Sequence, residues 1–132
     1  MHKKDLGGIS MVPHVLIVDD QPGICLLLEE ILKQEEIKVS IATDGRKALD
    51  MTNKNQYDVI LLDYHLPLYN GKQVIKELEK KDYKTSIIVM SGTSRENVEV
   101  LSQNPLVKKI ISKPFDIQEL RHFVLSILPK SS

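Results

Sequence analysis

Two neighbouring carboxylates, a third carboxylate, a hydroxyl and a lysine follow short aliphatic runs at separate places in the sequence. Asp19 and Asp20 follow the first run, Asp63 follows another, and Ser91 and Lys113 follow the last two. Carboxylates held close together repel one another, and a hard divalent cation such as Mg²⁺, helped by a lysine ammonium, keeps them ionised. A carboxylate in such a site can attack phosphorus and form an acyl phosphate. If these residues meet in the folded chain, they are equipped for phosphoryl transfer on Asp63.

The aliphatic runs have the length and character of buried strands. Continuous apolar runs this short are typical of central strands in a parallel sheet, where both faces are covered. They cover Val15–Val18, Val59–Leu62, Ile87–Met90 and Ile110–Ile111, and the alternating stretch Lys38–Ala42 adds a weaker fifth strand. Because ligands bind at the carboxyl ends of the strands in open parallel sheets, we expect the polar residues to converge at that edge.

Segments with helical periodicity separate the predicted strands. Apolar residues follow one helix face over 24–32 and 117–128, shorter helices surround Ala48 and Val74, and the weakest helix is predicted over 94–103. The residues that mark helix starts are Pro22, Asp44, Asn70 and Asp116, and Pro129 ends the last helix. Strict alternation, (βα)5, predicts a single-domain α/β fold with a doubly wound parallel sheet and helices on both faces.

Length, charge and cysteine content exclude several classes of protein. The chain has 132 residues, which suits one domain, and its 18 basic and 18 acidic side chains leave no positive excess for nucleic-acid binding. No apolar run could cross a membrane, and the N-terminal segment lacks the apolar stretch of a secretory signal. A single cysteine, Cys25, is typical of a reducing compartment. We therefore expect a cytoplasmic protein that binds neither nucleic acid nor membrane, and we expect a monomer.

The chain divides into two predicted parts. Residues 1–12 precede the first strand, contain Gly7–Gly8 and are expected to form a flexible tail. Within this tail, Met11 could be the native start in place of Met1. Residues 13–130 are expected to form the folded domain.

The polar residues at the strand ends resemble the site of the receiver domains of bacterial response regulators. The matching elements are Asp19–Asp20 after the first strand, Asp63 with Pro67 and Gly71 after the third, Ser91–Gly92 after the fourth and Lys113–Pro114–Phe115 after the fifth. They occur in the family's order with family-like spacing, and the resemblance spans about residues 13–129. Within the family, the chain looks most like the stand-alone phosphotransferases of the sporulation-initiation phosphorelay. The resemblance implies a flavodoxin-like sheet with strand order 2-1-3-4-5.

The resemblance implies a role for each site residue. Asp63 would be the phosphoacceptor and would hold Mg²⁺ together with Asp20 and the backbone carbonyl of His65. Asp19 would act on the metal mostly through bound water. Two further residues would contact the phosphoryl group, with Ser91 donating a hydrogen bond and Lys113 pairing with its charge.

The resemblance also implies partners. The donor would be a phosphohistidine on a histidine kinase or a histidine phosphotransfer protein, and a relay member would pass the group to another histidine. The surface expected to contact this partner flanks the site and comprises Gln21, Pro22, Gly23, Ile24, Pro114 and Phe115.

The sequence departs from the family's pattern at two positions that bear on function. Family members usually carry Tyr, Phe or His three residues before the lysine, where the ring changes its burial on phosphorylation. Here this switch position is Ile110, so a ring-based output switch is not expected. The lysine that the sporulation members carry two residues after the acceptor is His65 here. We expect the His65 side chain to border the site and to affect the lifetime of the phosphorylated form.

Three functions follow as hypotheses. The first is a single-domain response regulator that accepts a phosphoryl group on Asp63 and passes it on in a sporulation-type phosphorelay, as a phosphotransferase rather than a turnover enzyme. The second is a phosphorylation-switched adaptor for motility or kinase regulation, without onward transfer. The third is an aspartate-nucleophile phosphohydrolase, which usually carries a second Asp two residues after its nucleophile, where this chain has His65. The presence of both Asp63 and Lys113 favours the first.

Overall fold

The computed structural model of the chain contains a five-stranded parallel sheet. The structure describes residues 5–6, 9–10, 12–92 and 99–129. The strands of this sheet are β3 (His14–Val18), β4 (Lys38–Ala42), β5 (Val59–Asp63), β6 (Ser86–Ser91) and β7 (Val107–Ser112). They lie in the order β4-β3-β5-β6-β7, and every neighbouring pair is parallel. Numbered within this sheet alone, the order is 2-1-3-4-5, which confirms the predicted flavodoxin-like topology.

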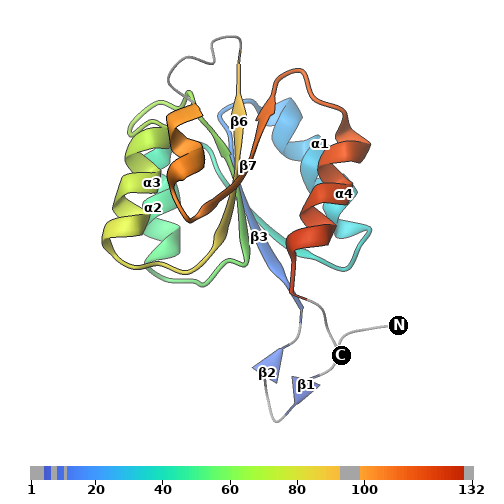
Figure 1. Cartoon of the computed structure of the whole chain (residues 1–132). Coiled ribbons are helices and arrows are strands. Elements are labelled where there is room, and N and C mark those ends of the chain that lie inside the picture. The colour runs from blue at the N-terminus through green and yellow to red at the C-terminus, as the bar shows by residue number, and fades with distance from the viewer. Residues whose placement is uncertain (1–4, 7–8, 11, 93–98, 130–132) are drawn as a thin grey trace.

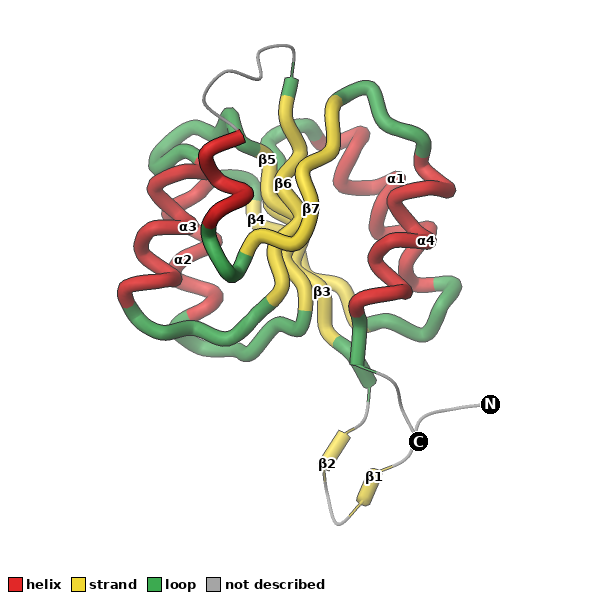
Figure 2. Tube along the Cα trace, viewed as in Figure 1, coloured by secondary structure: helices red, strands yellow, loops and turns green. Residues whose placement is uncertain are grey.

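Four α-helices of the described chain cover the two faces of the sheet (Figure 1). The pair α1 (Pro22–Lys33) and α4 (Ile117–Ile127) lies on one face, and the pair α2 (Gly45–Thr52) and α3 (Gly71–Lys80) lies on the other. Figure 2 shows the sheet as the central layer between these two pairs of helices. This three-layer, doubly wound arrangement confirms the predicted fold class.

The aliphatic runs form the core because both faces of the central strands are covered. Every residue of β5 is buried, and the four apolar residues that follow His14 in β3 have no exposed surface. Alternate side chains enter opposite halves of the core, so that Leu16 packs on the α2 and α3 side while Ile17 packs on the α1 and α4 side. This packing holds the ends of β3 and β5 in fixed positions at one edge of the sheet.

Three of the predicted helix starts are confirmed by hydrogen bonds. Asp44 caps α2, Asn70 caps α3 and Asp116 caps α4, each by accepting a backbone N–H on its side-chain oxygen. The start of α1 differs, because its N-cap residue is Gln21 and the Gln21 side chain makes no capping hydrogen bond. Pro22 favours the start of α1 instead, since its ring already has the helical backbone angle.

The helix predicted over 94–103 is not an α-helix in its described part. Residues 93–98 lie outside the described residues, and Glu99–Gln103 form a short 3₁₀ helix, η1. Leu101 is buried there, whereas Val100 is 63% exposed. A single buried anchor does not make the apolar stripe that an amphipathic α-helix needs, which accounts for the difference from the prediction.

Two short strands precede the sheet. β1 (Asp5–Leu6) and β2 (Ile9–Ser10) pair antiparallel with each other and not with the five-stranded sheet. The predicted flexible tail, residues 1–12, falls mostly on positions outside the described residues, as does Met11, and stays a prediction. None of the described helices has the length and apolar character to cross a membrane.

His14 begins β3, at the end of the sheet opposite to the polar strand ends. Its ring packs edge-on against Tyr57 with the ring centroids 4.5 Å apart, and its Nε2 lies 2.8 Å from Ser40 Oγ. Burial lowers the pKa of His14 and the charge of Lys38 lowers it further, against an opposing effect of Asp58. The folded protein therefore favours the neutral form of His14.

We expect the protein to lose stability as the pH falls below 6.5. The unfolded chain protonates His14 near its ordinary pKa of 6.5, whereas the folded chain keeps it neutral to lower pH, so acid favours unfolding. The stability that the folded protein gains from neutral His14 is present above the pKa of His14 in the unfolded chain, and it is lost as the pH falls through the lower pKa of the folded chain. Urea unfolding at about one pH unit above and below 6.5 measures the change in the free energy of unfolding. His14→Gln should reduce the loss, whereas His122→Gln, at an exposed position, should not. Equal pH dependence in His14→Gln and the parent would contradict the prediction.

Candidate functional site

The three carboxylates singled out in the sequence meet at one edge of the sheet. Asp19 and Asp20 follow β3, Asp63 ends β5, and each offers an oxygen within 4.8 Å of those of the other two. Asp19 has no exposed surface, Asp63 is 5% exposed and Asp20 is exposed. Because β3 and β5 are adjacent and parallel, their carboxyl ends lie side by side and bring these residues together.

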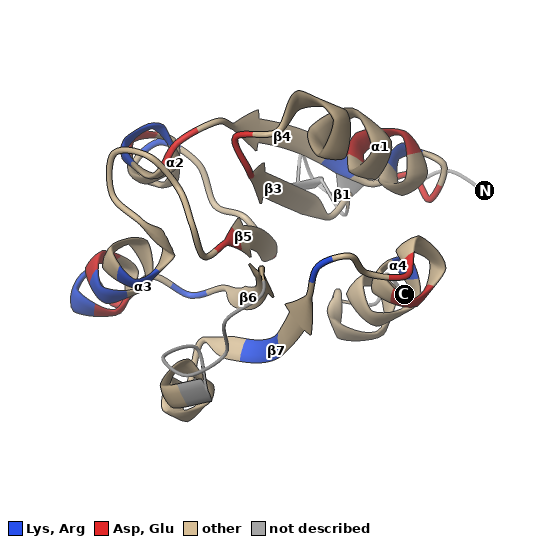
Figure 3. Ribbon diagram, turned by 90° about the horizontal axis from the view of Figure 1, so that it is seen from above, with Lys and Arg blue, Asp and Glu red and all other residues tan. Residues whose placement is uncertain are grey.

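Lys113 reaches the same carboxylates from the loop between β7 and α4. Its Nζ lies 2.9 Å from Asp19 Oδ2 and 3.5 Å from Asp63 Oδ2. Seen from above, the ribbon is acidic just after β3 and at the end of β5, and it is basic just after β7 (Figure 3). The Lys113 ammonium also lies 3.4 Å from Gln21 Oε1. One ammonium therefore bridges a fully buried carboxylate and the predicted phosphoacceptor.

The site is short of positive charge. Burial raises the pKa of Asp63 above its ordinary value, although the backbone N–H of His65, which donates to Asp63 Oδ1 at 3.1 Å, and the charge of Lys113 both act to lower it. Burial acts to lower the pKa of Lys113, but the hydrogen bond to Asp19 and the charges of Asp63 and Asp19 outweigh it and raise the pKa. Lys113 therefore stays charged, and Asp63 remains incompletely compensated.

The carboxylates fit a hard divalent cation. Carboxylate oxygens are ligands that Mg²⁺ prefers, and the three of them carry two more negative charges than Lys113 balances. Asp20 is the exposed member, which suits an ion that keeps several of its water ligands. The backbone N–H of His65 donates to Asp63. The predicted role of the His65 carbonyl as a metal ligand stays a prediction.

Ser91 and Ile110 lie on the neighbouring strands β6 and β7. Ser91 ends β6, is 1% exposed, and its backbone carbonyl accepts the N–H of Lys113 at 2.7 Å. The pairing of β6 with β7 thus places the Ser91 and Lys113 segments side by side. Ile110 is half-buried against the core on the α2 and α3 side. The hydrogen-bonding role of Ser91 and the switch role of Ile110 stay predictions.

Most residues predicted to contact a partner surround an apolar groove beside the carboxylates. The groove has a volume of about 460 Å³ and is lined by Gln21, Ile24, Leu27, Gly92, Lys113, Pro114 and Phe115. Pro22 and Gly23 are exposed in the first turn of α1 but do not line it. Leu27, which is 50% exposed, was not predicted, although it follows Ile24 by three residues and so shares its helix face.

His65 borders the mouth of the site. Its side chain is exposed, and its ring packs edge-on against Tyr64 with the centroids 5.1 Å apart. A Cβ placed on Gly92 would lie 3.8 Å from His65 Cδ2, so the imidazole stands beside the end of β6. Gly92 also lines the apolar groove, and the effect of the His65 side chain on the site stays a prediction.

Comparison with known sequences agrees with this geometry. The profile of the response regulator receiver domain matches residues 15–125 of the chain. Sporulation initiation phosphotransferase F of Bacillus subtilis (strain 168) is 34% identical over 118 residues, which span 89% of this chain and 95% of that protein. The profile match covers the sheet and its covering helices except for the first residue of β3 and the last two residues of α4.

Solved structures share the fold. The receiver domain of a Francisella response regulator has a TM-score of 0.80 at 30% identity, over 87% of this chain and 95% of that chain. The response regulator protein TrrA of Thermotoga maritima, solved in complex with Mg²⁺-BeF, has a TM-score of 0.78 at 30% identity, over 89% of this chain and 100% of that chain.

Proposed function

The chain belongs to the response regulator receiver family, and on that premise we propose that it accepts a phosphoryl group on Asp63 and passes it to another protein. The observation that carries the proposal is the position of Lys113 Nζ, 3.5 Å from Asp63 Oδ2, beside three carboxylates that could share a cation. The donor is a phosphohistidine of a histidine kinase or histidine phosphotransfer protein, and the acceptor is a second histidine. The name of the Bacillus subtilis relative supports a relay of the sporulation type.

In the proposed reaction, a carboxylate oxygen of Asp63 attacks the phosphorus of the phosphohistidine. A P–O bond to Asp63 forms while the P–N bond breaks, and the electron pair of that bond stays with the imidazole, which takes up a proton. Lys113 stabilises the charge on the phosphoryl oxygens, and the Ser91 hydroxyl donates a hydrogen bond to one of them. Onward transfer runs the same bond changes in reverse, toward a second imidazole.

Asp20, Asp63 and the backbone carbonyl of His65 would hold Mg²⁺, with Asp19 acting through water. When bound, the ion supplies positive charge that offsets both the carboxylates and the phosphoryl oxygens. The raised pKa of Asp63 supports this assignment, because it shows that Lys113 alone does not compensate for burial.

The apolar groove next to Asp63 supports docking of a helical partner. Ile24, Leu27 and Phe115 line it, and an amphipathic helix that carries the phosphohistidine could bury its apolar face there. Lys113 lines the same groove, so a helix in the groove would approach the reacting carboxylate.

The proposed compartment is the cytoplasm, since the chain's cysteine is buried and unpaired, as suits a reducing environment.

An adaptor without onward transfer is the alternative, and Ile110 is the residue that bears on it. Ile110 has no ring to reorient on phosphorylation, which favours transfer over a ring-based binding switch. To test transfer, phosphate-labelled protein freed of its donor is mixed separately with each histidine phosphotransfer protein and kinase of its organism. We expect one of them to take up the label while this chain loses it. If the chain is phosphorylated but no histidine protein takes up the label, the adaptor function holds instead.

We expect His65→Lys to lengthen the life of phosphorylated Asp63 about two- to fivefold. A lysine ammonium at this exposed position would pair with the phosphoryl oxygens, a contact worth on the order of 1 kcal/mol or less. Intact-mass measurements over time, after the phosphodonor is removed, give the half-life. The control is His122→Lys, at an exposed position on α4, which should leave the half-life unchanged. An unchanged half-life in His65→Lys would make this side chain a bystander.

A further inference from the structure

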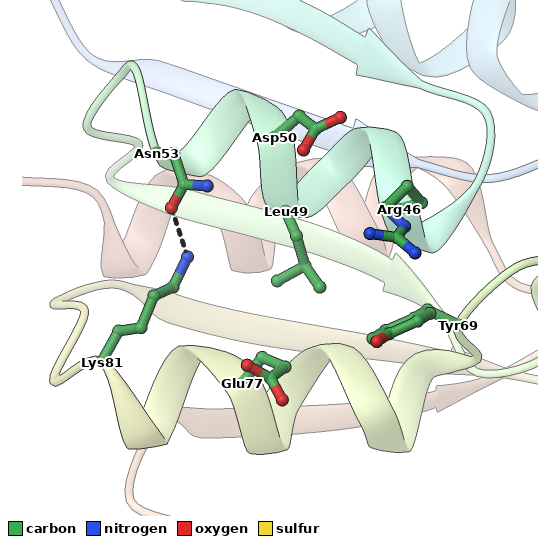
Figure 4. A pocket seen from close by; sticks show the side chains of 7 residues that line it. All are labelled: Arg46, Leu49, Asp50, Asn53, Tyr69, Glu77 and Lys81. Atoms are coloured by element: carbon green, nitrogen blue, oxygen red, sulfur yellow. Dashed lines mark hydrogen bonds between the residues drawn. The ribbon is translucent and has the colours of Figure 1, made fainter.

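A second groove lies between α2 and α3, on the face of the sheet away from α1 and α4 (Figure 4). It has a volume of about 240 Å³ and is lined by side chains of both helices and by Tyr69 from the loop between β5 and α3. The buried Leu49 points from α2 toward α3 and gives the groove an apolar floor. We propose that this groove binds a small amino carboxylate, a molecule whose carboxylate and ammonium groups are joined by an apolar chain.

Arg46 provides the carboxylate subsite. Its guanidinium carbon lies 5.1 Å from the centroid of the Tyr69 ring, and this cation–π contact orients the group within the groove. The guanidinium makes no hydrogen bond or ion pair with any residue that the structure describes. Its N–H donors are therefore free for a ligand, and their planar fork matches the two oxygens of a carboxylate.

Glu77 provides the ammonium subsite. This half-buried carboxylate rises from α3 into the groove, and within the described part of the chain no cation pairs with it. Lys81 lines the same groove, but its Nζ donates to Asn53 Oδ1 at 2.6 Å and closes the far end (Figure 4). Two cations, Arg46 and Lys81, and two carboxylates, Glu77 and Asp50, line the groove, and the ion pairs of the described residues include none of them. A groove that offers both signs of charge beside Leu49 favours a ligand that carries both charges over a simple anion or cation.

The loop that carries Tyr69 is held against α2 before any ligand arrives. The backbone N–H of Arg46 donates to the Leu68 carbonyl at 3.0 Å, and Leu68 and Tyr69 have φ angles of 49° and 76°. Gly45 permits this close approach, because a Cβ there would overlap the Tyr69 carbonyl oxygen. The ring and the guanidinium are therefore already placed, which reduces the entropy lost on binding.

Backbone amide chemical shifts of the isotope-labelled full chain test the proposal. The probes are ω-amino carboxylates of increasing length: glycine, β-alanine, γ-aminobutyrate and ε-aminocaproate. We expect at least one to shift the amides of Arg46, Leu49 and Glu77 in a saturable way, with a Kd on the order of 1 mM. Two analogues of the best probe, one without its ammonium group and one without its carboxylate, should each bind about fivefold more weakly than that probe. For ε-aminocaproate these analogues are caproate and hexylamine. The absence of saturable shifts in this groove with every probe overturns the proposal, as does equal binding of the best probe and its two analogues.

Substitutions separate a specific site from a general charge effect. Arg46→Gln and Glu77→Gln should each weaken the best probe about fivefold, because each removes one of the two charge contacts. Lys47→Gln is the matched control, since Lys47 is an exposed neighbour on α2 that does not line the groove. It should leave the Kd unchanged. Thermal unfolding confirms that each variant is folded, and an equal loss of affinity in Lys47→Gln overturns the proposal.

Discussion

Asp63→Asn should abolish phosphorylation of the protein. Incubated with Mg²⁺ and a small phosphodonor such as acetyl phosphate, the parent chain should gain the mass of one phosphoryl group and the variant none. The side-chain amide of the variant would be neutral and a poor nucleophile, whereas the Asp63 carboxylate is almost buried and lies beside Lys113. Intact-mass spectrometry measures the adduct directly, and a chelator should suppress it in the parent because the carboxylates would lose their cation.

Asp50→Asn provides the matched control for this experiment. Asp50 is an exposed aspartate on α2, so the same chemical change there should leave the adduct intact. An adduct that persists in Asp63→Asn would move the phosphate to another residue and remove the basis of the proposed function. Loss of the adduct in both variants would point to a general effect of charge on the reaction.

Asp63→Asn should also stabilise the folded protein at neutral pH in the absence of metal. Because burial raises the pKa of Asp63 above the unfolded value of 3.8, its contribution to stability is full below that pH and is lost as the pH rises through the folded pKa. Asparagine avoids this loss, so thermal unfolding of Asp63→Asn should show a higher Tm at neutral pH. The difference should vanish near pH 3.8 and shrink when Mg²⁺ is added. An unchanged Tm at neutral pH would mean that Lys113 compensates fully for burial.

The site's position could be predicted from the sequence because it depends on local patterns. A short aliphatic run such as Val15–Val18 or Val59–Leu62 is stable only when both faces are covered, and the residue after it then lies at the sheet edge. Once β3 and β5 pair in parallel, Asp19 and Asp63 necessarily lie close together. The starts of α2, α3 and α4 could also be predicted, because a capping side chain such as Asp44 acts only within the first turn of its own helix.

Other features depend on contacts between distant segments, and no local pattern signals them. Lys113 lies nearer to Asp19 than to Asp63, which depends on the course of the loop after β7. The groove between α2 and α3 depends on positive φ angles at Leu68 and Tyr69, which residues other than glycine adopt only when their surroundings require it. The 3₁₀ helix η1 stands where the sequence predicts a longer helix, and the burial of Leu101 rather than Val100 depends on packing against other segments.

Lys113→Ala should slow phosphorylation of Asp63 by a factor on the order of 10² to 10³, the usual effect of removing one preorganised group that stabilises transition-state charge. Lys113 contacts Asp19 at 2.9 Å and Asp63 at 3.5 Å, so its loss leaves the carboxylates without this ammonium and the phosphoryl oxygens without a charged partner. The pKa of Asp63, already raised by burial, should rise further. A smaller fraction of the nucleophile would then be ionised at a given pH.

The initial rate of adduct formation with a small phosphodonor measures this effect. Lys113→Arg keeps the positive charge and should recover part of the rate, although its larger planar group fits a site built for an ammonium less well. Lys108→Ala is the matched control on β7, because Lys108 is exposed and its Nζ donates to the Pro105 carbonyl, away from the carboxylates. It should react at the parental rate. If folded Lys113→Ala stayed within about threefold of the parent, the metal rather than the lysine would carry the charge stabilisation.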